Sequence, residues 1–198
     1  QQLLFQAARQ TEDVQARTRR LSERSITADT SIVSRRHGFE YFNELFVKRH
    51  RRVLWMPAAR NALASIALVL IALPVLASMP QARARVNDLL TRSLPYFVFI
   101  MYAINRGTSF TRSLFMNCDH SLLTYGFYKQ PRMVLRLFAI RLREIVKVNL
   151  LPASVIGAGA CLLLLCSGGA APLDYAMYLV SLPCLSVFFS VHYLTLYY

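Results

Sequence analysis

Residues 61–79 read NALASIALVLIALPVLASM, and no charged residue occurs between Arg60 and Arg83. An α-helix rises roughly 1.5 Å per residue, so about 20 apolar residues cover the roughly 30 Å hydrocarbon core of a bilayer. The stretch therefore predicts a membrane-spanning helix over about residues 60–80.

Three further stretches have the same character, at about residues 89–106, 148–167 and 174–198. Residues 149–198 contain no Lys or Arg, and CSGGAAPLD at 166–174 supplies a turn between the last two stretches. The 89–106 stretch is short between Arg92 and Arg106, so it spans only if the helix begins near Leu89 and Arg92 reaches back to the headgroups. The predicted fold class is an all-α polytopic transmembrane helix bundle.

The composition separates this chain from soluble domains and from nucleic-acid binders. Its 198 residues are 55% hydrophobic and 17% charged, with a net charge of +13. A nucleic-acid partner is not expected, because Lys and Arg gather in blocks between apolar runs instead of over one face. The blocks at 47–55 and 106–147 place these segments in the cytoplasm by the positive-inside rule. Residues 80–92 and 167–174 are then short external loops of a multi-pass protein of the cytoplasmic (inner) membrane.

The chain divides into a cytoplasmic polar and amphipathic segment, residues 1–56, and a transmembrane domain, residues 57–198. Residues 1–33 have too few apolar residues to build a core. Residues 38–55 predict an amphipathic helix lying in the membrane interface, with one face formed by Phe39, Phe42, Phe46 and Leu45. Because the sequence begins with Gln1 and stops inside an apolar run, we expect it to be a piece of a longer protein.

Each expected span contains one proline. Prolines are tolerated in membrane helices, where they act as ordinary kinks or as hinges that move. The third span also carries small residues at four-residue spacing, which allow close approach of another helix. The prolines are Pro74, Pro95, Pro152 and Pro183, and the small residues are Ala153, Gly157 and Cys161.

Signals of catalysis are few. No glycine is followed by lysine, so a phosphate-binding loop for ATP does not occur. The four cysteines, Cys118, Cys161, Cys166 and Cys184, show no C-x-x-C spacing. We therefore expect no enzyme activity, no cofactor and no metal in this chain.

Cys118, Asp119 and His120 form a polar group in the connection between the second and third spans. Adjacent residues on a helix point in different directions, so a catalytic arrangement is disfavoured. Asp119 is better interpreted as the N-cap of a short helix beginning at His120. His192 lies inside the fourth span, where it serves either as a hydrogen-bonding partner in the bundle or as a pathway residue.

The connection, residues 107–147, is the most informative polar segment. Gly126 and Pro131 punctuate two helices, and after Pro131 basic residues recur at helical spacing among apolar ones. These charges either anchor the end of a long helix to the membrane or form a surface that docks another protein. The candidate anchoring residues are Arg51, Arg52, Arg132, Arg136, Arg143 and Lys147.

Three stretches resemble bacterial ABC exporter permeases, the membrane subunits of ABC-2-like export systems. They are EYFNELFVKRHRRVLW (40–55), SLFMNCDHSLLTYGFYKQP (113–131) with the basic helix that follows it, and VHYLTLYY (191–198). The resemblance implies a permease paired with a second permease copy or half and driven by a separate ATPase subunit. It further implies that a short helix in the connection couples the ATPase to the spans, with Asn117, Asp119, Tyr125, Phe127 and Tyr128 as candidate docking residues.

The aromatic residues Tyr125, Phe127 and Tyr128 support the docking interpretation, because clustered aromatics outside lipid are usually covered by a partner. The alternative is that they pack against the first sixty residues or the membrane surface. Two other function classes stay open: a membrane-embedded lipid-processing enzyme, and a non-catalytic assembly or sensor protein.

Overall fold

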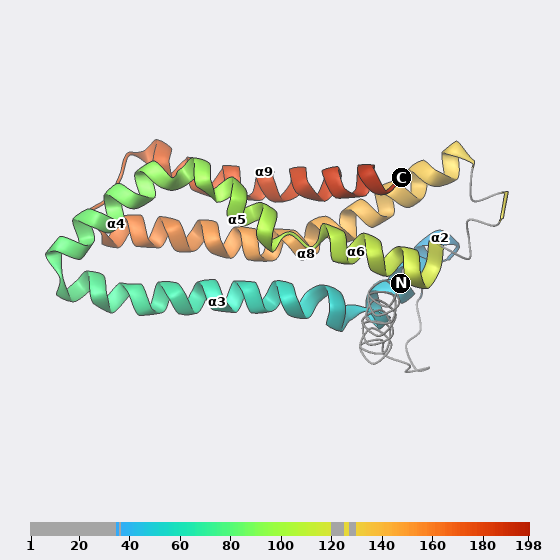
Figure 1. Ribbon diagram of the computed structural model, residues 1–198, viewed down its shortest axis with the longest axis horizontal. Helices are drawn as coiled ribbons and strands as arrows, with labels where there is room; N and C mark the ends of the chain where they lie inside the picture. The colour runs from blue at the N-terminus through green and yellow to red at the C-terminus, as the bar shows by residue number, and fades with distance from the viewer. Residues whose placement is uncertain (1–34, 36, 120–124, 127–129) are drawn as a thin grey trace, which may run out of the picture. The chain divides into compact units, whose positions relative to one another are not determined.

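The structure is a computed structural model that describes residues 35, 37–119, 125–126 and 130–198. These residues form helices and no strand, so the expected all-α fold is confirmed (Figure 1). The chain separates into two compact units, residues 1–54 and 55–198, which we describe separately.

In the first unit, the predicted amphipathic helix is α2, Phe39–Arg49. It begins after Gly38, whose positive φ of 64° is readily adopted by glycine. At its other end, His50 donates its backbone N–H to the carbonyl of Phe46 and stacks on the Phe46 ring, with centroids 4.2 Å apart. Phe46 is buried, whereas the side chains of Phe39 and Phe42 lie outside the described part of the chain. The helix is therefore confirmed over Phe39–Arg49, but it ends earlier than predicted, because residues 51–55 belong to α3 (Arg51–Ser78). Of its proposed apolar face, Phe46 is buried.

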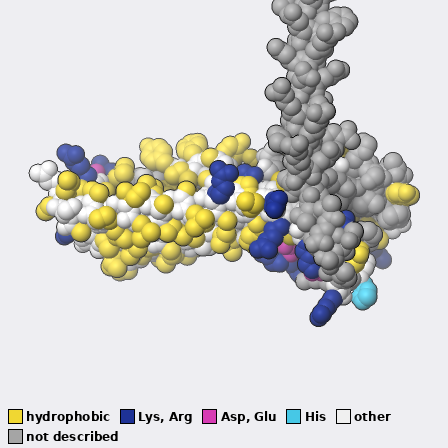
Figure 2. Space-filling model, turned by 90° about the horizontal axis from the view of Figure 1, so that it is seen from below, with side chains coloured by type: hydrophobic (Ala, Val, Ile, Leu, Met, Phe, Trp, Pro, Cys, Tyr) yellow, Lys and Arg dark blue, Asp and Glu magenta, His cyan; other side chains and the backbone are white. Residues whose placement is uncertain are grey.

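Within the described part of the chain, three helices are long and apolar enough to cross a membrane: α3 (Arg51–Ser78), α8 (Pro131–Cys166) and α9 (Pro172–Tyr197). They contain the first, third and fourth expected spans. Their outward side chains include Leu68, Ile71 and Leu165, all exposed. Figure 2 shows a body covered largely by hydrophobic side chains, with Lys and Arg toward its ends. These features are those of a membrane protein.

The prediction of a single helix over residues 89–106 is wrong. That part of the chain is divided into α4 (Pro80–Ser93), a 3-10 turn η1 (Leu94–Tyr96) and α5 (Phe97–Ile104), followed by α6 (Gly107–Leu114). Pro95 has no backbone N–H and so interrupts the α-helical hydrogen-bond pattern. At the second break Asn105 is extended, and its side-chain oxygen accepts the N–H of Gly107, 2.7 Å away.

The prediction of a loop at residues 80–92 is also wrong, since these residues belong to the helix α4. Pro80 stands in the first turn, where its missing N–H has no cost. Arg83 turns back and donates from Nε to the carbonyl of Leu76 (2.5 Å) and from Nη2 to that of Ala77 (3.0 Å), at the end of α3. From there α4, α5 and α6 return along α8 and α9 (Figure 1).

Pro74, Pro152 and Pro183 lie inside continuous helices, and α8 bends along its course in Figure 1. Pro95 differs, because it falls in the 3-10 turn between two helices. Three of the four prolines are therefore accommodated within an unbroken helix, and the fourth marks a break.

The core lies between α8 and α9, which pack as an antiparallel pair, and Leu90 of α4 and Met101 of α5 complete it. Gly157 of α8 permits close approach, since a Cβ there would lie 3.1 Å from the carbonyl oxygen of Tyr178. The Sγ of Cys161, one turn further, lies 3.6 Å from the carbonyl oxygen of Tyr175. The small residues thus face α9, as their spacing predicts. Gly107 similarly lets α6 contact α9, because a Cβ there would lie 2.4 Å from ring atoms of Tyr193.

Candidate functional site

The connection from α6 toward α8 begins with a wide helical turn. The segment η2, Phe115–Asp119, has π-helical hydrogen bonding and follows α6 directly. Short π-helical turns often occur at functional sites. This one ends at Asp119, whose side chain is 3% exposed.

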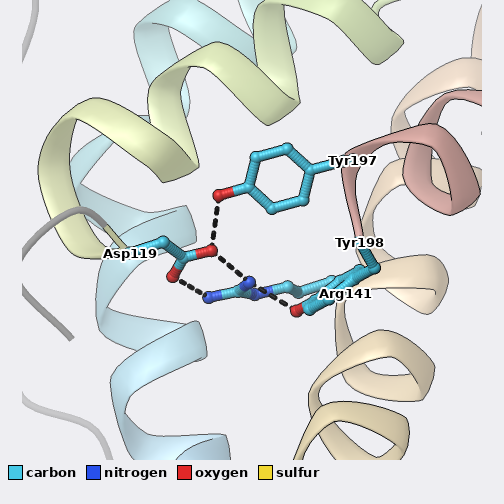
Figure 3. A network of polar contacts seen from close by, with 4 residues as sticks. All are labelled: Asp119, Arg141, Tyr197 and Tyr198. Carbon is cyan, nitrogen blue, oxygen red and sulfur yellow. Dashed lines mark hydrogen bonds and ion pairs between the residues drawn. The ribbon is translucent and has the colours of Figure 1, made fainter. Parts of the chain in front are cut away.

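Arg141, on the buried face of α8, holds this carboxylate with both ends of its guanidinium. Nη1 donates to Oδ2 and Nη2 to Oδ1 of Asp119, each across 2.6 Å (Figure 3). The Arg141 side chain is 5% exposed. Such a two-point contact fixes direction as well as distance, so it sets the orientation of the end of η2 relative to α8.

The last two tyrosines of the described chain bring α9 into the same network. The hydroxyl of Tyr197 donates to Oδ2 of Asp119, 2.5 Å away. Arg141 Nη1 also donates to the hydroxyl of Tyr198 at 2.5 Å, and the guanidinium carbon lies 5.7 Å from the centre of that ring. Figure 3 shows the carboxylate between Arg141 and Tyr197. We call Asp119, Arg141, Tyr197 and Tyr198 the polar latch.

The polar latch joins three parts of the chain that are far apart in sequence: the end of η2, the first half of α8 and the end of α9. A buried ion pair of this kind adds geometric specificity more than stability, whereas removal of either partner is costly. The arrangement is therefore suited to holding the connection in one position.

A second polar tie lies deeper along α8. The side-chain oxygen of Asn149 accepts the backbone N–H of Arg106, and its nitrogen donates to the hydroxyl of Ser190, both at 2.9 Å. Ser190 in turn donates to the carbonyl of Ser186 at 2.8 Å. Asn149 thus links the break between α5 and α6 to both α8 and α9.

The predicted docking residues separate in the structure. Asp119 is buried, so its side chain serves the interior of the bundle and not an outer contact surface. Tyr125 is 55% exposed. The side chain of Asn117, and Phe127 and Tyr128 entirely, lie outside the described residues.

The predicted N-cap role of Asp119 also falls outside the described residues, because the helix would begin at His120. The side chain of Cys118 lies outside them as well. Among the residues that the structure does describe, no group of three or more His, Cys, Asp or Glu side chains could hold a metal ion. His192 is on α9, with its ring stacked on that of Phe188 at a centroid distance of 6.1 Å.

The predicted anchoring residues are all exposed, as anchoring requires. They are Arg51, Arg52, Arg132, Arg136, Arg143 and Lys147.

Sequence reasoning missed Arg141, although a signal was present. Arg141 follows Arg132 by nine residues, about two and a half turns, so it lies on the opposite side of the helix. It stands four residues from both Leu137 and Ile145, which are buried. An arginine in the middle of an apolar helical stripe predicts a buried partner. For Tyr197 and Tyr198 no comparable signal separates a network residue from an interfacial aromatic.

Comparison with protein-family models, curated proteins and solved structures finds no match for this chain.

Proposed function

We propose that this chain is the membrane-spanning permease subunit of an ABC-type export system of the bacterial inner membrane. A separate ATPase subunit drives it, and a second permease copy or half completes the assembly. The N-terminal end of α8 and the polar latch then face the cytoplasm, because the exposed Arg and Lys of α8 gather at that end.

The polar latch is the observation that carries this proposal. A permease driven by a separate ATPase needs a cytoplasmic element whose displacement moves the spans. The carboxylate of Asp119 is bound by Arg141 of α8 and Tyr197 of α9, so a displacement of η2 pulls on both helices. A loosely tethered loop would not transmit such a force.

The length of α8 supports the same reading. Its 36 residues extend about 54 Å, whereas the hydrocarbon core is about 30 Å thick. About 24 Å of helix therefore projects beyond the hydrocarbon. Arg141 lies on this projecting part, which acts as a lever continuous with the span.

The test is co-expression of the chain with the ATPase subunit encoded beside it, followed by co-purification in detergent. The double variant Phe127→Ala and Tyr128→Ala should lose the ATPase while its folded yield stays unchanged. Tyr96→Ala is the matched control, because Tyr96 is an exposed aromatic far along the chain from the connection, and it should retain the ATPase.

Two results count against the proposal. Retention of the ATPase by the double variant, or loss of folded yield alone, assigns these aromatics to the fold. Hydrolysis of ATP by the purified chain without any partner contradicts the division between permease and ATPase.

A further inference from the structure

A stripe of cations follows the outer face of the first half of α8. Arg132, Arg136, Arg143 and Lys147 are spaced by four, seven and four residues, so they share one side of the helix. All four are exposed, and the buried Arg141 lies on the opposite side. The stripe is therefore an outer surface, distinct from the polar latch.

The exposed side of α8 changes chemistry at Val148, where its uncharged part begins. Beyond this point the exposed side chains include Leu151, Leu162 and Leu165, and Leu165 is 67% exposed. An apolar surface that gives way to cations matches the order of lipid tails and headgroups in a bilayer. From Arg143 to Leu165, the exposed side of α8 is thus complementary to lipid.

Distance along α8 divides the stripe into two pairs. Lys147 adjoins Val148. Measured along the helix axis from Val148, Arg143 lies about 7.5 Å away, whereas Arg136 and Arg132 lie about 18 and 24 Å away. The headgroup layer is only about 5–8 Å thick. Arg143 and Lys147 therefore reach lipid phosphates, and the outer pair lies beyond them.

One acidic group belongs to this surface. Glu144 accepts from the ammonium of Lys147 at 2.9 Å. Ion pairs of this exposed type contribute little, and an ammonium has three donors. Lys147 thus remains able to bind a phosphate.

We propose that Arg143 and Lys147, which are four residues apart on the exposed side of α8, form a binding site for anionic phospholipid headgroups at the boundary of the bundle. The site selects phosphatidylglycerol-type lipids over zwitterionic lipids, because a zwitterionic headgroup carries its own cation. Arginine adds two-point hydrogen bonding to phosphate oxygens. The inference rests on the membrane fold and is independent of the assignment to an export system.

The experiment measures lipid binding to the purified full chain in neutral detergent. Phosphatidylglycerol or phosphatidylcholine is added, and both bound lipid and the midpoint of thermal unfolding are recorded. The unsubstituted chain should prefer phosphatidylglycerol. Arg143→Gln and Lys147→Gln should each lower the ratio of the two affinities roughly fivefold, since a cation near an anionic surface contributes about 1 kcal/mol. The double variant Arg143→Gln and Lys147→Gln should lower this ratio further.

The double variant Arg132→Gln and Arg136→Gln is the matched control, with the same charge change on the same side of α8. It should keep the preference. Arg143→Lys, which retains the charge, should keep most of it and guards against a glutamine variant that fails to fold.

Three results overturn the proposal. Equal binding of the two lipids shows that there is no headgroup selectivity. Equal loss in the control variant shows a diffuse charge effect, which fits an acidic protein partner better. Equal stabilisation by millimolar inorganic phosphate shows a site for free anions instead of lipid.

Discussion

Replacement of Arg141 by methionine should destabilise the bundle strongly. Methionine fills a similar space but leaves the Asp119 carboxylate without its cation, in a place where the side chain is 3% exposed. Two charge-assisted hydrogen bonds of 2.6 Å are lost, and the hydroxyl of Tyr198 loses its donor. Breaking one partner of a buried pair costs about 3–5 kcal/mol, so the free energy of unfolding should fall by about that amount.

The double variant Asp119→Leu and Arg141→Met should be far less affected than either single variant. Removing both charges leaves no buried ion without a counter-charge, and apolar replacement of a buried pair is often close to neutral. Unfolding by titration with sodium dodecyl sulfate in mixed micelles, followed by helical circular dichroism, gives the free energies. Arg136→Met is the control: the same substitution at an exposed position of α8 should change stability by less than about 0.5 kcal/mol.

The coupling between the two substitutions decides whether the reasoning holds. A coupling energy of about 2 kcal/mol or more is expected for groups in direct ionic contact. If the effects of the two single variants simply add to within about 0.5 kcal/mol, Asp119 and Arg141 do not act as a pair and the polar latch is refuted.

Three further outcomes are expected. Gly107→Ala should lower the unfolding free energy by about 1–3 kcal/mol, because its Cβ would overlap the half-buried ring of Tyr193. Gly126→Ala, with open space around its Cβ, should leave the unfolding free energy unchanged, and the same detergent titration measures both. Asn149→Ala should lower the unfolding free energy by about 1 kcal/mol, because the backbone N–H of Arg106 and the hydroxyl of Ser190 lose this partner. A decrease smaller than that caused by an Asn→Ala change at an exposed position counts against a structural role of these two hydrogen bonds. Cysteines introduced singly into a cysteine-free chain should react with an impermeant reagent from outside at residues 81–91 and not at Lys129; outside labelling at Lys129 contradicts the orientation.

The long apolar runs predicted α3, α8 and α9 because an uninterrupted stretch of about 20 apolar residues has few alternatives to a membrane helix. The structure of residues 80–106 was harder to predict. Counting charges marked α4 as a loop, although Pro80 at its start was a usable helix signal. The break at Asn105 depends on a side chain that accepts a nearby N–H, and apolar periodicity does not register such local bonds.

The site was only half predictable, for a related reason. Asp119 was identified as a polar group with a structural role, but its partner follows 22 residues later, in a helix whose other basic residues are exposed. The average charge of a segment does not indicate on which side of the helix each charged residue lies. Assigning every charge to a side of the helix before interpreting it would have isolated Arg141. Tyr197 and Tyr198 become recognisable only once the fold brings the end of α9 to the end of η2.

The positions of the polar ties follow from the breaks in the returning path. In lipid, apolar surface alone does not hold one helix to another, and every freed backbone group needs a partner. Near the break at Pro95, the carbonyl of Leu90 accepts from the hydroxyl of Tyr178 at 2.7 Å. At the break after Asn105, the N–H of Arg106 is bound by Asn149.

Each break in the path from α4 to α6 is therefore met by a side chain of α8 or α9, and the polar latch repeats the arrangement at the end of η2. The side chains of α8 and α9 thus provide hydrogen-bond partners for backbone groups at the breaks between these shorter helices. Under the proposed function, a displacement of the connection reaches α8 and α9 through these polar contacts, in addition to the continuous helix α8.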